Sequence, residues 1–145
     1  MLALIQRVNW ARVVISGEVH AEIGEGLLAL IGVEKEDDSA AADKLLHKIL
    51  SYRVFADVEG KMNLGLKDKG GELLLVSQFT LAASTTKGLR PGFSTAKPPA
   101  EAEVLYDELV SKAQKEYGPV QSGVFAADMQ VALENNGPVT FMLRS

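Results

Sequence analysis

The chain has 145 residues, of which 47% are hydrophobic and 23% are charged, with a formal net charge of −4 at pH 7. We therefore expect one globular domain over residues 1–145, a size that buries about 68–70% of the unfolded surface without disulfides or a structural metal. The sequence contains no cysteine, which excludes disulfides, thiolate nucleophiles and sulfur-ligated zinc. The negative net charge argues against broad binding to phosphate backbones, so a nucleic-acid partner would have to be held locally.

The sequence also lacks membrane and export signals. No stretch reaches the roughly 18 apolar residues that suggest a membrane span. The segment Met1 to Arg7 places its first positive charge after its apolar residues, and no small-residue cleavage site follows a long apolar run. We expect a cytoplasmic protein with no membrane partner.

The first third of the chain predicts a hairpin followed by a buried strand. Leu2 to Val8 and Arg12 to Ile15 have strand patterns, and Ser16-Gly17 forms a turn into the strand Glu18 to Ile23. The apolar run Leu27 to Val33 is bounded by glycines and has the length of a strand buried on both faces, so we place it centrally.

A helix and a second buried strand follow. Ser39 is a predicted N-cap, and apolar residues then recur at helical spacing. Val54 to Ala56 and the turn at Gly60 predict a short strand pair. Glu72 to Leu81 predicts another buried strand.

The remainder predicts a long loop, one helix and two strands. Ala82 to Pro99 is rich in small and polar residues, a length at which structureless loops are often functional. Residues 102–117 have helical periodicity, and Met129 to Leu133 and Val139 to Leu143 are predicted strands. Strands outnumber helices, so the predicted class is α+β, with the helices on one side of layered sheets.

Two short motifs carry the candidate chemistry. Ser77-Gln78-Phe79-Thr80-Leu81 places hydroxyls, an amide and backbone N–H groups at a strand end. Asn136-Gly137-Pro138-Val139-Thr140 provides a backbone without a side chain beside a proline. Together they predict a site built largely from main chain, although Thr80 alone also suits an ordinary strand end and Gly137-Pro138 an ordinary turn.

Other classes of site find less support. A threonine nucleophile needs an adjacent base, and the sequence places neither His20 nor His47 beside Thr80. The spacings of dinucleotide-binding and phosphate-binding glycine loops are absent. The carboxylates in residues 34–38 cluster where a helix begins and suit its dipole, and no ligand spacing indicates a metal. We predict neither metal nor cofactor.

The two motifs resemble the signature motifs of the D-aminoacyl-tRNA deacylases, enzymes that remove D-amino acids from mischarged tRNA. The resemblance runs through the whole chain. It also includes Gln6-Arg7-Val8, Gly32-Val33-Glu34, Gly60-Lys61-Met62-Asn63, Lys87-Gly88, Arg90-Pro91, Gly123-Val124-Phe125 and Ala127-Asp128-Met129.

The resemblance implies a compact three-layer β/β/α domain that forms a homodimer with its active sites at the interface. In that family the dipeptide matching Gly137-Pro138 has a cis bond and enters the pocket of the other subunit, where its carbonyl groups face the chiral centre of the substrate. Arg7 matches a residue that braces this dipeptide. The filter would reject L-amino acids sterically, but it would admit achiral glycine, including glycine mischarged onto alanine tRNA.

For the chemistry, the resemblance implies hydrolysis of the aminoacyl ester at the 3′ end of tRNA. The predicted catalytic set is Ser77, Gln78, Phe79 and Thr80, with backbone N–H groups at Phe79 and Thr80 facing the developing oxyanion. The ribose 2′-OH of the terminal adenosine is implied to assist, without an indispensable acid or base from the protein.

Further residues match positions that hold the tRNA. Phe125 and Met129 correspond to the lining of the adenosine pocket, while hydrophobic core is the ordinary alternative. Lys87 and Arg90 are predicted to contact acceptor-stem phosphates, although a charged loop gives the same pattern.

The chain departs from the family pattern at Ala82, Ser84, Leu89, Gly92, Ala126 and Asn136. Two alternative functions remain open at this stage. One is a generic ester hydrolase with Thr80 as nucleophile, and the other is a non-catalytic module that binds an RNA 3′ end.

Overall fold

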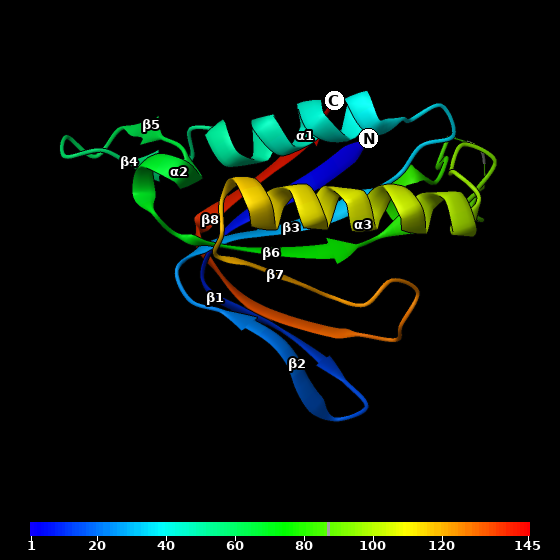
Figure 1. Cartoon of the computed structure of the whole chain (residues 1–145), viewed down its shortest axis with the longest axis horizontal. Coiled ribbons are helices and arrows are strands. Elements are labelled where there is room, and N and C mark those ends of the chain that lie inside the picture. The colour runs from blue at the N-terminus through cyan, green and yellow to red at the C-terminus, as the bar shows by residue number, and fades with distance from the viewer. Residues whose placement is uncertain (87) are drawn as a thin grey trace.

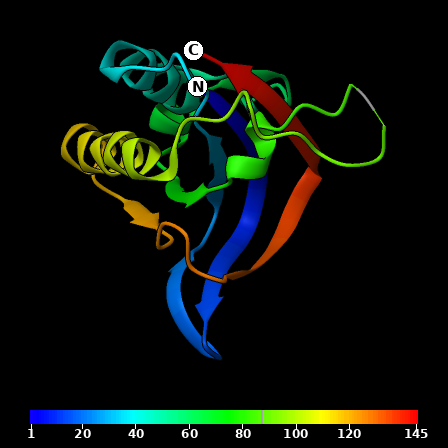
Figure 2. The same ribbon diagram turned by 90° about the vertical axis from the view of Figure 1, so that its right-hand side faces the viewer.

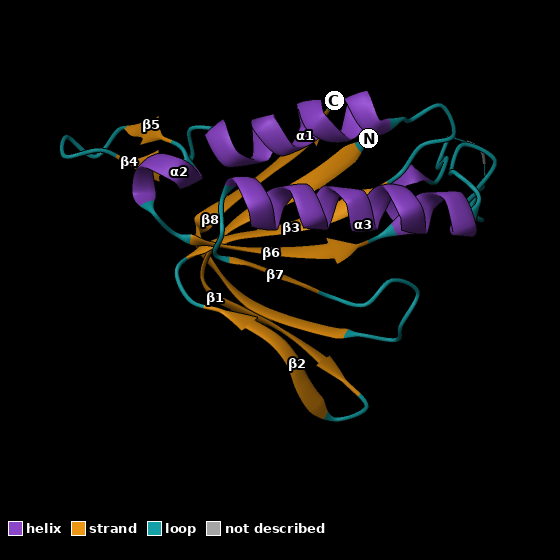
Figure 3. Ribbon diagram, in the orientation of Figure 1, coloured by secondary structure: helices purple, strands orange, loops and turns teal. Residues whose placement is uncertain are grey.

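One six-stranded mixed sheet carries the fold, in a computed structural model that describes residues 1–86 and 88–145 (Figures 1 and 3). Its strands are β1 (Leu2–Ile15), β2 (Glu18–Ile23), β3 (Gly26–Gly32), β6 (Glu72–Ser77), β7 (Val120–Ser122) and β8 (Gln130–Arg144), and a separate two-stranded sheet is formed by β4 (Phe55–Ala56) and β5 (Met62–Leu64). The helices are α1 (Ser39–Ser51), α2 (Leu66–Lys69), the 3-10 turn η1 (Phe79–Ala82) and α3 (Pro99–Glu116).

The long strand β1 organises the sheet. It pairs antiparallel with β3 through its first half, with β2 through its second half, and with β8 along nearly its whole length. On the other side of β3, β6 and β7 continue the sheet in parallel. The sheet curls until β2 contacts β6 and β7, which gives it a barrel-like form (Figure 2).

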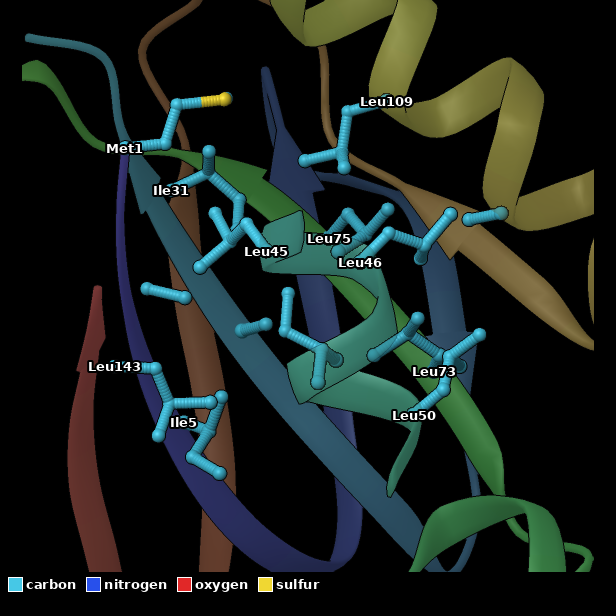
Figure 4. Packing of buried hydrophobic residues seen from close by; sticks show 14 of the residues in the cluster. Met1, Ile5, Ile31, Leu45, Leu46, Leu50, Leu73, Leu75, Leu109 and Leu143 are labelled. Carbon is cyan, nitrogen blue, oxygen red and sulfur yellow. The ribbon is translucent and has the colours of Figure 1, made fainter. Parts of the chain in front are cut away.

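Two hydrophobic cores lie on opposite faces of this sheet. Side chains alternate along a strand, so Leu27 and Leu73 enter the core under the helices, whereas Leu28 and Leu74 enter the core enclosed by the curled sheet. Figure 4 shows the first core, where α1, α3 and β6 contribute leucines to one packed cluster. The predicted layering is therefore produced by one sheet that bends over itself.

The helices cover one face of the sheet, as expected (Figure 1). The predicted apolar positions of α1 are buried: Ala42, Leu45, Leu46, Ile49 and Leu50. The N-cap is Asp38 rather than Ser39, because the Asp38 carboxylate accepts a hydrogen bond from the Ala41 N–H at 2.9 Å.

Four elements differ from the sequence prediction. The strand predicted over Glu72 to Leu81 ends at Ser77 and continues as η1, although Phe79 and Thr80 favour strands. The two predicted C-terminal strands are one strand, β8, because β1 is long enough to pair with both parts across an irregular middle. The short elements β7 and α2 were not predicted from the sequence. The α+β class itself is confirmed.

Within the part of the chain that the structure describes, no helix combines the length and apolar character needed to cross a bilayer.

Candidate functional site

A cavity with a volume of about 450 Å³ opens where β6 ends. Its walls come from residues 76–79, from Ala96, Lys97, Pro99 and Ala102 before and within α3, and from residues 125–129 and Val131 after β7. Apolar walls with a few polar groups at this volume are typical of a small-molecule site. Ser77, Gln78, Phe79, Phe125 and Met129 were predicted site residues, and the fold brings them together here.

The first wall is formed where the chain leaves the sheet. The Gln78 N–H donates to the Ile31 carbonyl oxygen at 2.7 Å, which continues the contact between β6 and β3 by one residue before η1 begins. Phe79 is then 60% exposed, and its ring lies 5.1 Å from that of Phe93, centroid to centroid. An aromatic pair is thus presented to solvent beside the cavity.

Thr80 lies next to this wall, and its hydroxyl group is hydrogen-bonded to the Gln78 side chain. The Gln78 side-chain amide donates to the Thr80 hydroxyl oxygen at 2.6 Å, which orients the hydroxyl group without removing its proton. His20 on β2 and His47 on α1 are both exposed, and neither lines the cavity. Among the described residues, no histidine or carboxylate side chain hydrogen-bonds to the Thr80 hydroxyl group, as activation of a threonine nucleophile would require.

Main-chain donors are present at the same place. The first N–H groups of a helical turn have no partner within the turn, and the N-cap residue Gln78 makes no side-chain capping hydrogen bond. The N–H groups at the start of η1 therefore suit an oxygen atom that develops negative charge.

The opposite wall is the segment that follows β7. The Gly123 N–H donates to the Leu75 carbonyl oxygen at 2.9 Å, which attaches this segment to β6. A Cβ atom at Gly123 would lie 2.7 Å from Met129 Sδ, so the Met129 side chain occupies space that only glycine leaves open. Phe125 packs against Tyr106 of α3 with a centroid distance of 6.0 Å.

Several lining residues were not singled out from the sequence as site residues. Ala126 has φ +59°, a left-handed conformation that favours glycine, and its departure from the family pattern was the available signal. Lys97 lines the cavity, and its ammonium group donates to the Lys35 carbonyl oxygen at 2.9 Å. Nothing in the sequence indicated Asp128 as a site residue beyond its place in a family motif.

The segment Asn136 to Val139 lies outside the cavity lining. β1 and β8 pair Gln6 with Thr140 and Val8 with Asn135, so residues 136–139 bulge opposite the single residue Arg7. Gly137 and Pro138 are exposed, and the bond between them is cis. Gly137 has φ +137°, and a Cβ atom there would lie 2.7 Å from Val139 Cγ2, so the position accepts only glycine without rearrangement.

Side-chain hydrogen bonds hold this bulge at both ends. Arg7 Nε donates to the Asn136 carbonyl oxygen at 3.0 Å, and Arg7 Nη1 donates to the Val54 carbonyl oxygen at 2.6 Å. The Asn135 side chain accepts from the Val139 N–H at 2.9 Å and donates to the Thr140 hydroxyl oxygen at 2.8 Å. Arg7 thus contacts Asn136, the residue before the dipeptide, and within one chain the bulge and the cavity are separate features.

Of the two predicted tRNA-contacting residues, one lies outside this cavity and the other is not among the residues that the structure describes. Arg90 is exposed on the loop between η1 and α3 and does not line the cavity. Lys87 falls outside the described residues. Among the described residues, no group of three acidic or histidine side chains is arranged to hold a metal ion.

Tyr106 is the titratable group behind the cavity with a shifted pKa. Burial raises the pKa of its phenol well above the usual value, and the nearby Asp107 charge raises it further. The phenol therefore stays protonated and acts as a hydrogen-bond donor throughout the physiological range of pH.

Comparison with known proteins identifies relatives over the full length. Residues 4–144 match the profile of the family described as D-Tyr-tRNA(Tyr) deacylase. A D-aminoacyl-tRNA deacylase from Stutzerimonas stutzeri strain A1501 is 61% identical over 145 residues, covering 100% of both chains. A protein of the same name from Pseudomonas fluorescens strain Pf0-1 has the same identity and coverage.

Two solved structures share the fold of this chain. A structure titled c-Myc DNA Unwinding Element Binding Protein superposes with a TM-score of 0.96 at 40% identity, covering 100% of this chain and 99% of the other. A structure titled as a probable eukaryotic D-amino acid tRNA deacylase superposes with a TM-score of 0.86 at 15% identity, covering 98% and 97% of the two chains, and shares the fold.

Proposed function

This chain belongs to the D-Tyr-tRNA(Tyr) deacylase family, a family of ester hydrolases acting on D-aminoacyl-tRNA, and we propose that the cavity at the end of β6 is where it hydrolyses that ester. The products are a free D-amino acid and tRNA. The observation that carries this proposal is the convergence of Ser77, Gln78 and Phe79 with Phe125 and Met129 around one cavity.

The chemistry needs orientation more than it needs a reactive side chain. An aminoacyl ester is already activated, so a positioned water and N–H donors facing the oxyanion supply much of the acceleration, each donor contributing about 2.7–4 kcal/mol. The start of η1 offers such donors, and Gln78 keeps the Thr80 hydroxyl group in one place. The 2′-OH of the terminal ribose supplies further assistance in this scheme.

The terminal adenosine fits the apolar part of the cavity. Stacking of a nucleobase on an aromatic side chain contributes about 1–3 kcal/mol, and Phe125 lies in the wall beside the flexible side chain of Met129. Arg90, which is exposed on the loop between η1 and α3, is then available for acceptor-stem phosphates, and we propose the same contact for Lys87. The net charge of −4 favours such local contact over broad nucleic-acid binding. We place this activity in the cytoplasm, with tRNA as the partner.

Gly137-Pro138 acts as the chirality filter in this proposal, and it acts in the cavity of a second copy. The bulge is exposed and held by Arg7 and Asn135, and it does not line the cavity of its own chain. Exposed apolar side chains near η1 and along β8, Phe79, Phe93, Phe141 and Met142, provide surface that a homodimer would cover.

The filter works by exclusion. Main-chain atoms held against the α-carbon leave no volume for an L side chain, whereas a D side chain points elsewhere. A thousandfold preference requires about 4 kcal/mol at roughly 1.36 kcal/mol per decade, an amount that one rigid clash supplies. Glycine has no side chain to exclude, so glycyl-tRNA, including glycine mischarged onto alanine tRNA, is also a substrate.

The basic test compares D-tyrosyl-tRNA with L-tyrosyl-tRNA. The pure protein should deacylate the D form and leave the L form intact. Equal loss of both forms would refute chiral selection, while tight binding without turnover would support the RNA-binding alternative. A covalent intermediate on Thr80 would support the threonine nucleophile.

Mixed dimers test the second-copy filter directly. One copy carries Phe79→Ala, which damages the cavity, and the other carries Arg7→Ala, which removes the support of the bulge. Heterodimers isolated through two different tags should show wild-type selectivity, because the intact cavity receives the intact bulge from its partner. If the heterodimer has the relaxed selectivity of the Arg7→Ala homodimer, the filter acts within one chain. A monomeric protein in light scattering would also overturn the proposal.

A further inference from the structure

The Leu75 carbonyl oxygen joins three elements behind the cavity. Leu75 lies on β6, two residues before Ser77, and its carbonyl oxygen accepts the Gly123 N–H at 2.9 Å. The same oxygen accepts the hydroxyl group of Tyr106, on α3, also at 2.9 Å. The strand leading to one wall and the segment forming the other wall therefore share one hydrogen-bonded atom.

Tyr106 contacts both walls from behind. Its side chain is only 2% exposed, its hydroxyl group reaches β6, and its ring packs 6.0 Å from the ring of Phe125. Water has no access to replace the hydroxyl group, so its loss leaves a local defect rather than a solvated gap. The raised pKa of the phenol keeps it a donor at any working pH.

We propose that Tyr106 is a positioning residue for ester hydrolysis, holding the end of β6 and the segment carrying Phe125 at the separation that the reaction needs. It does not touch the substrate. It sets the distance between the oxyanion donors at the start of η1 and the surface that holds the adenosine. The inference rests on the proposed use of this cavity and adds a residue that neither motif contains.

The chain offers a matched control at the other end of β6. Tyr117 is the C-cap residue of α3, and its hydroxyl group donates to the Leu66 carbonyl oxygen at 3.2 Å and also to that of Gly71. Both tyrosines thus connect α3 to backbone carbonyl groups near an end of β6. Tyr106 does so beside the cavity, where its ring packs against the lining residue Phe125, whereas the hydrogen-bond partners of Tyr117 do not line the cavity.

The experiment compares Tyr106→Phe with Tyr117→Phe in the full-length protein. Each variant keeps its ring and loses one hydroxyl group, and thermal unfolding checks that both fold. With D-tyrosyl-tRNA, Tyr106→Phe should lower kcat by about 5- to 20-fold while KM changes by less than about twofold, because misplacement of reacting groups affects the rate more than binding. Tyr117→Phe should keep kcat within about twofold of wild type.

A second measurement separates the inference from the assumed activity. Amide hydrogen exchange at Gly123 should accelerate in Tyr106→Phe but not in Tyr117→Phe, whether or not the protein turns over. Equal losses of kcat in both variants, or unchanged kcat in Tyr106→Phe, would overturn the positioning role. Unchanged exchange at Gly123 would overturn the shared contact itself. A wild-type protein inactive on every D-aminoacyl-tRNA would instead overturn the proposed function.

Discussion

Arg7→Lys is the most informative single change in this protein. It preserves the positive charge on β1 but replaces a planar fork with a single ammonium group. In the structure the guanidinium group donates to two carbonyl oxygens, those of Asn136 in the bulge and Val54 before β4. Lysine can reach one of them but cannot hold both in the same geometry.

The energetic cost of Arg7→Lys follows from the loss of one of these two hydrogen bonds. A hydrogen bond to a charged group contributes about 1.5–3 kcal/mol, and Arg7 is only half-buried, so solvent compensates part of the loss. Losing one of the two bonds should therefore cost at most about 1.5–3 kcal/mol. For a chain of roughly this size, 1 kcal/mol corresponds to about 2–4 °C, so we expect the melting temperature to fall by at most about 12 °C.

Selectivity should change more than rate. The bulge would lose a restraint at Asn136, the residue before Gly137, whereas no cavity wall is altered. We expect kcat for D-tyrosyl-tRNA to stay within about threefold of wild type, while hydrolysis of L-tyrosyl-tRNA rises at least about tenfold, which equals roughly 1.4 kcal/mol of lost discrimination. Single-turnover deacylation of the two substrates measures both quantities.

Arg12→Lys is the control, because Arg12 lies on the same strand but its guanidinium group is placed over the Trp10 ring at 5.3 Å. This variant should keep the selectivity of the wild type. If Arg7→Lys lowers the melting temperature as expected and yet leaves the ratio of D to L hydrolysis unchanged, then the position of the bulge does not determine chirality, and the reasoning is wrong.

Three further outcomes are expected. Thr80→Ala should retain at least about a tenth of wild-type kcat, because it loses one neutral hydrogen bond worth about 0.5–1.5 kcal/mol; complete loss in single-turnover assays would favour a threonine nucleophile. Ala126→Gly should raise the free energy of unfolding by up to about 1.5 kcal/mol, since a left-handed alanine costs about 1–2 kcal/mol and glycine adds about 0.5–1 kcal/mol of entropy. Ser16 has φ +52° in the distant hairpin turn, so Ser16→Gly should stabilise the protein similarly in chemical denaturation without changing kcat. A lower free energy of unfolding for Ala126→Gly would contradict the backbone strain assigned to Ala126. Dialysis against EDTA should leave deacylation unchanged, and recovery of lost activity by an added divalent cation would contradict the metal-free scheme.

The elements that sequence patterns predicted well are those whose burial is set locally. The five apolar positions of α1 recur at helical spacing and are all buried. The turn at Ser16-Gly17 has positive φ at both residues, as a tight hairpin requires, and joins β1 to β2 as expected. Both depend on residues a few positions apart, so periodicity and turn chemistry are sufficient.

The elements whose limits were predicted wrongly depend on pairing with strands that are distant in the sequence. β6 ends at Ser77 because its last parallel pair is with Ile31, and the propensity of Phe79 and Thr80 for strands does not register that limit. The middle of β8 bulges away from β1, but β1 is continuous and pairs with β8 before and after the bulge, so the two predicted strands form one strand. Only the three-dimensional pairing specifies these limits.

The residues of the candidate site also divide into those that the sequence indicated and those that only the structure reveals. Ser77, Gln78 and Phe79 were accessible as a motif, and Phe125 and Met129 were accessible through family resemblance. Tyr106 was not, because a tyrosine at an apolar helical position gives the pattern of an ordinary core residue. Its role depends on a hydroxyl group that meets one carbonyl oxygen of another element.

The separation of the cavity from the Gly137-Pro138 bulge has a consequence for how selectivity and rate are related. The cavity walls depend on the end of β6, whereas the bulge depends on contacts among β1, β8 and the residue before β4. If two copies join these features, a change in the support of the bulge alters the D to L ratio, and a change behind the cavity alters the rate. Arg7 and Tyr106 probe the two supports independently, so their effects on the transition-state free energy should add in the double variant. Strong coupling between them would mean that the filter also orients the ester for hydrolysis, and that selection and catalysis are one event.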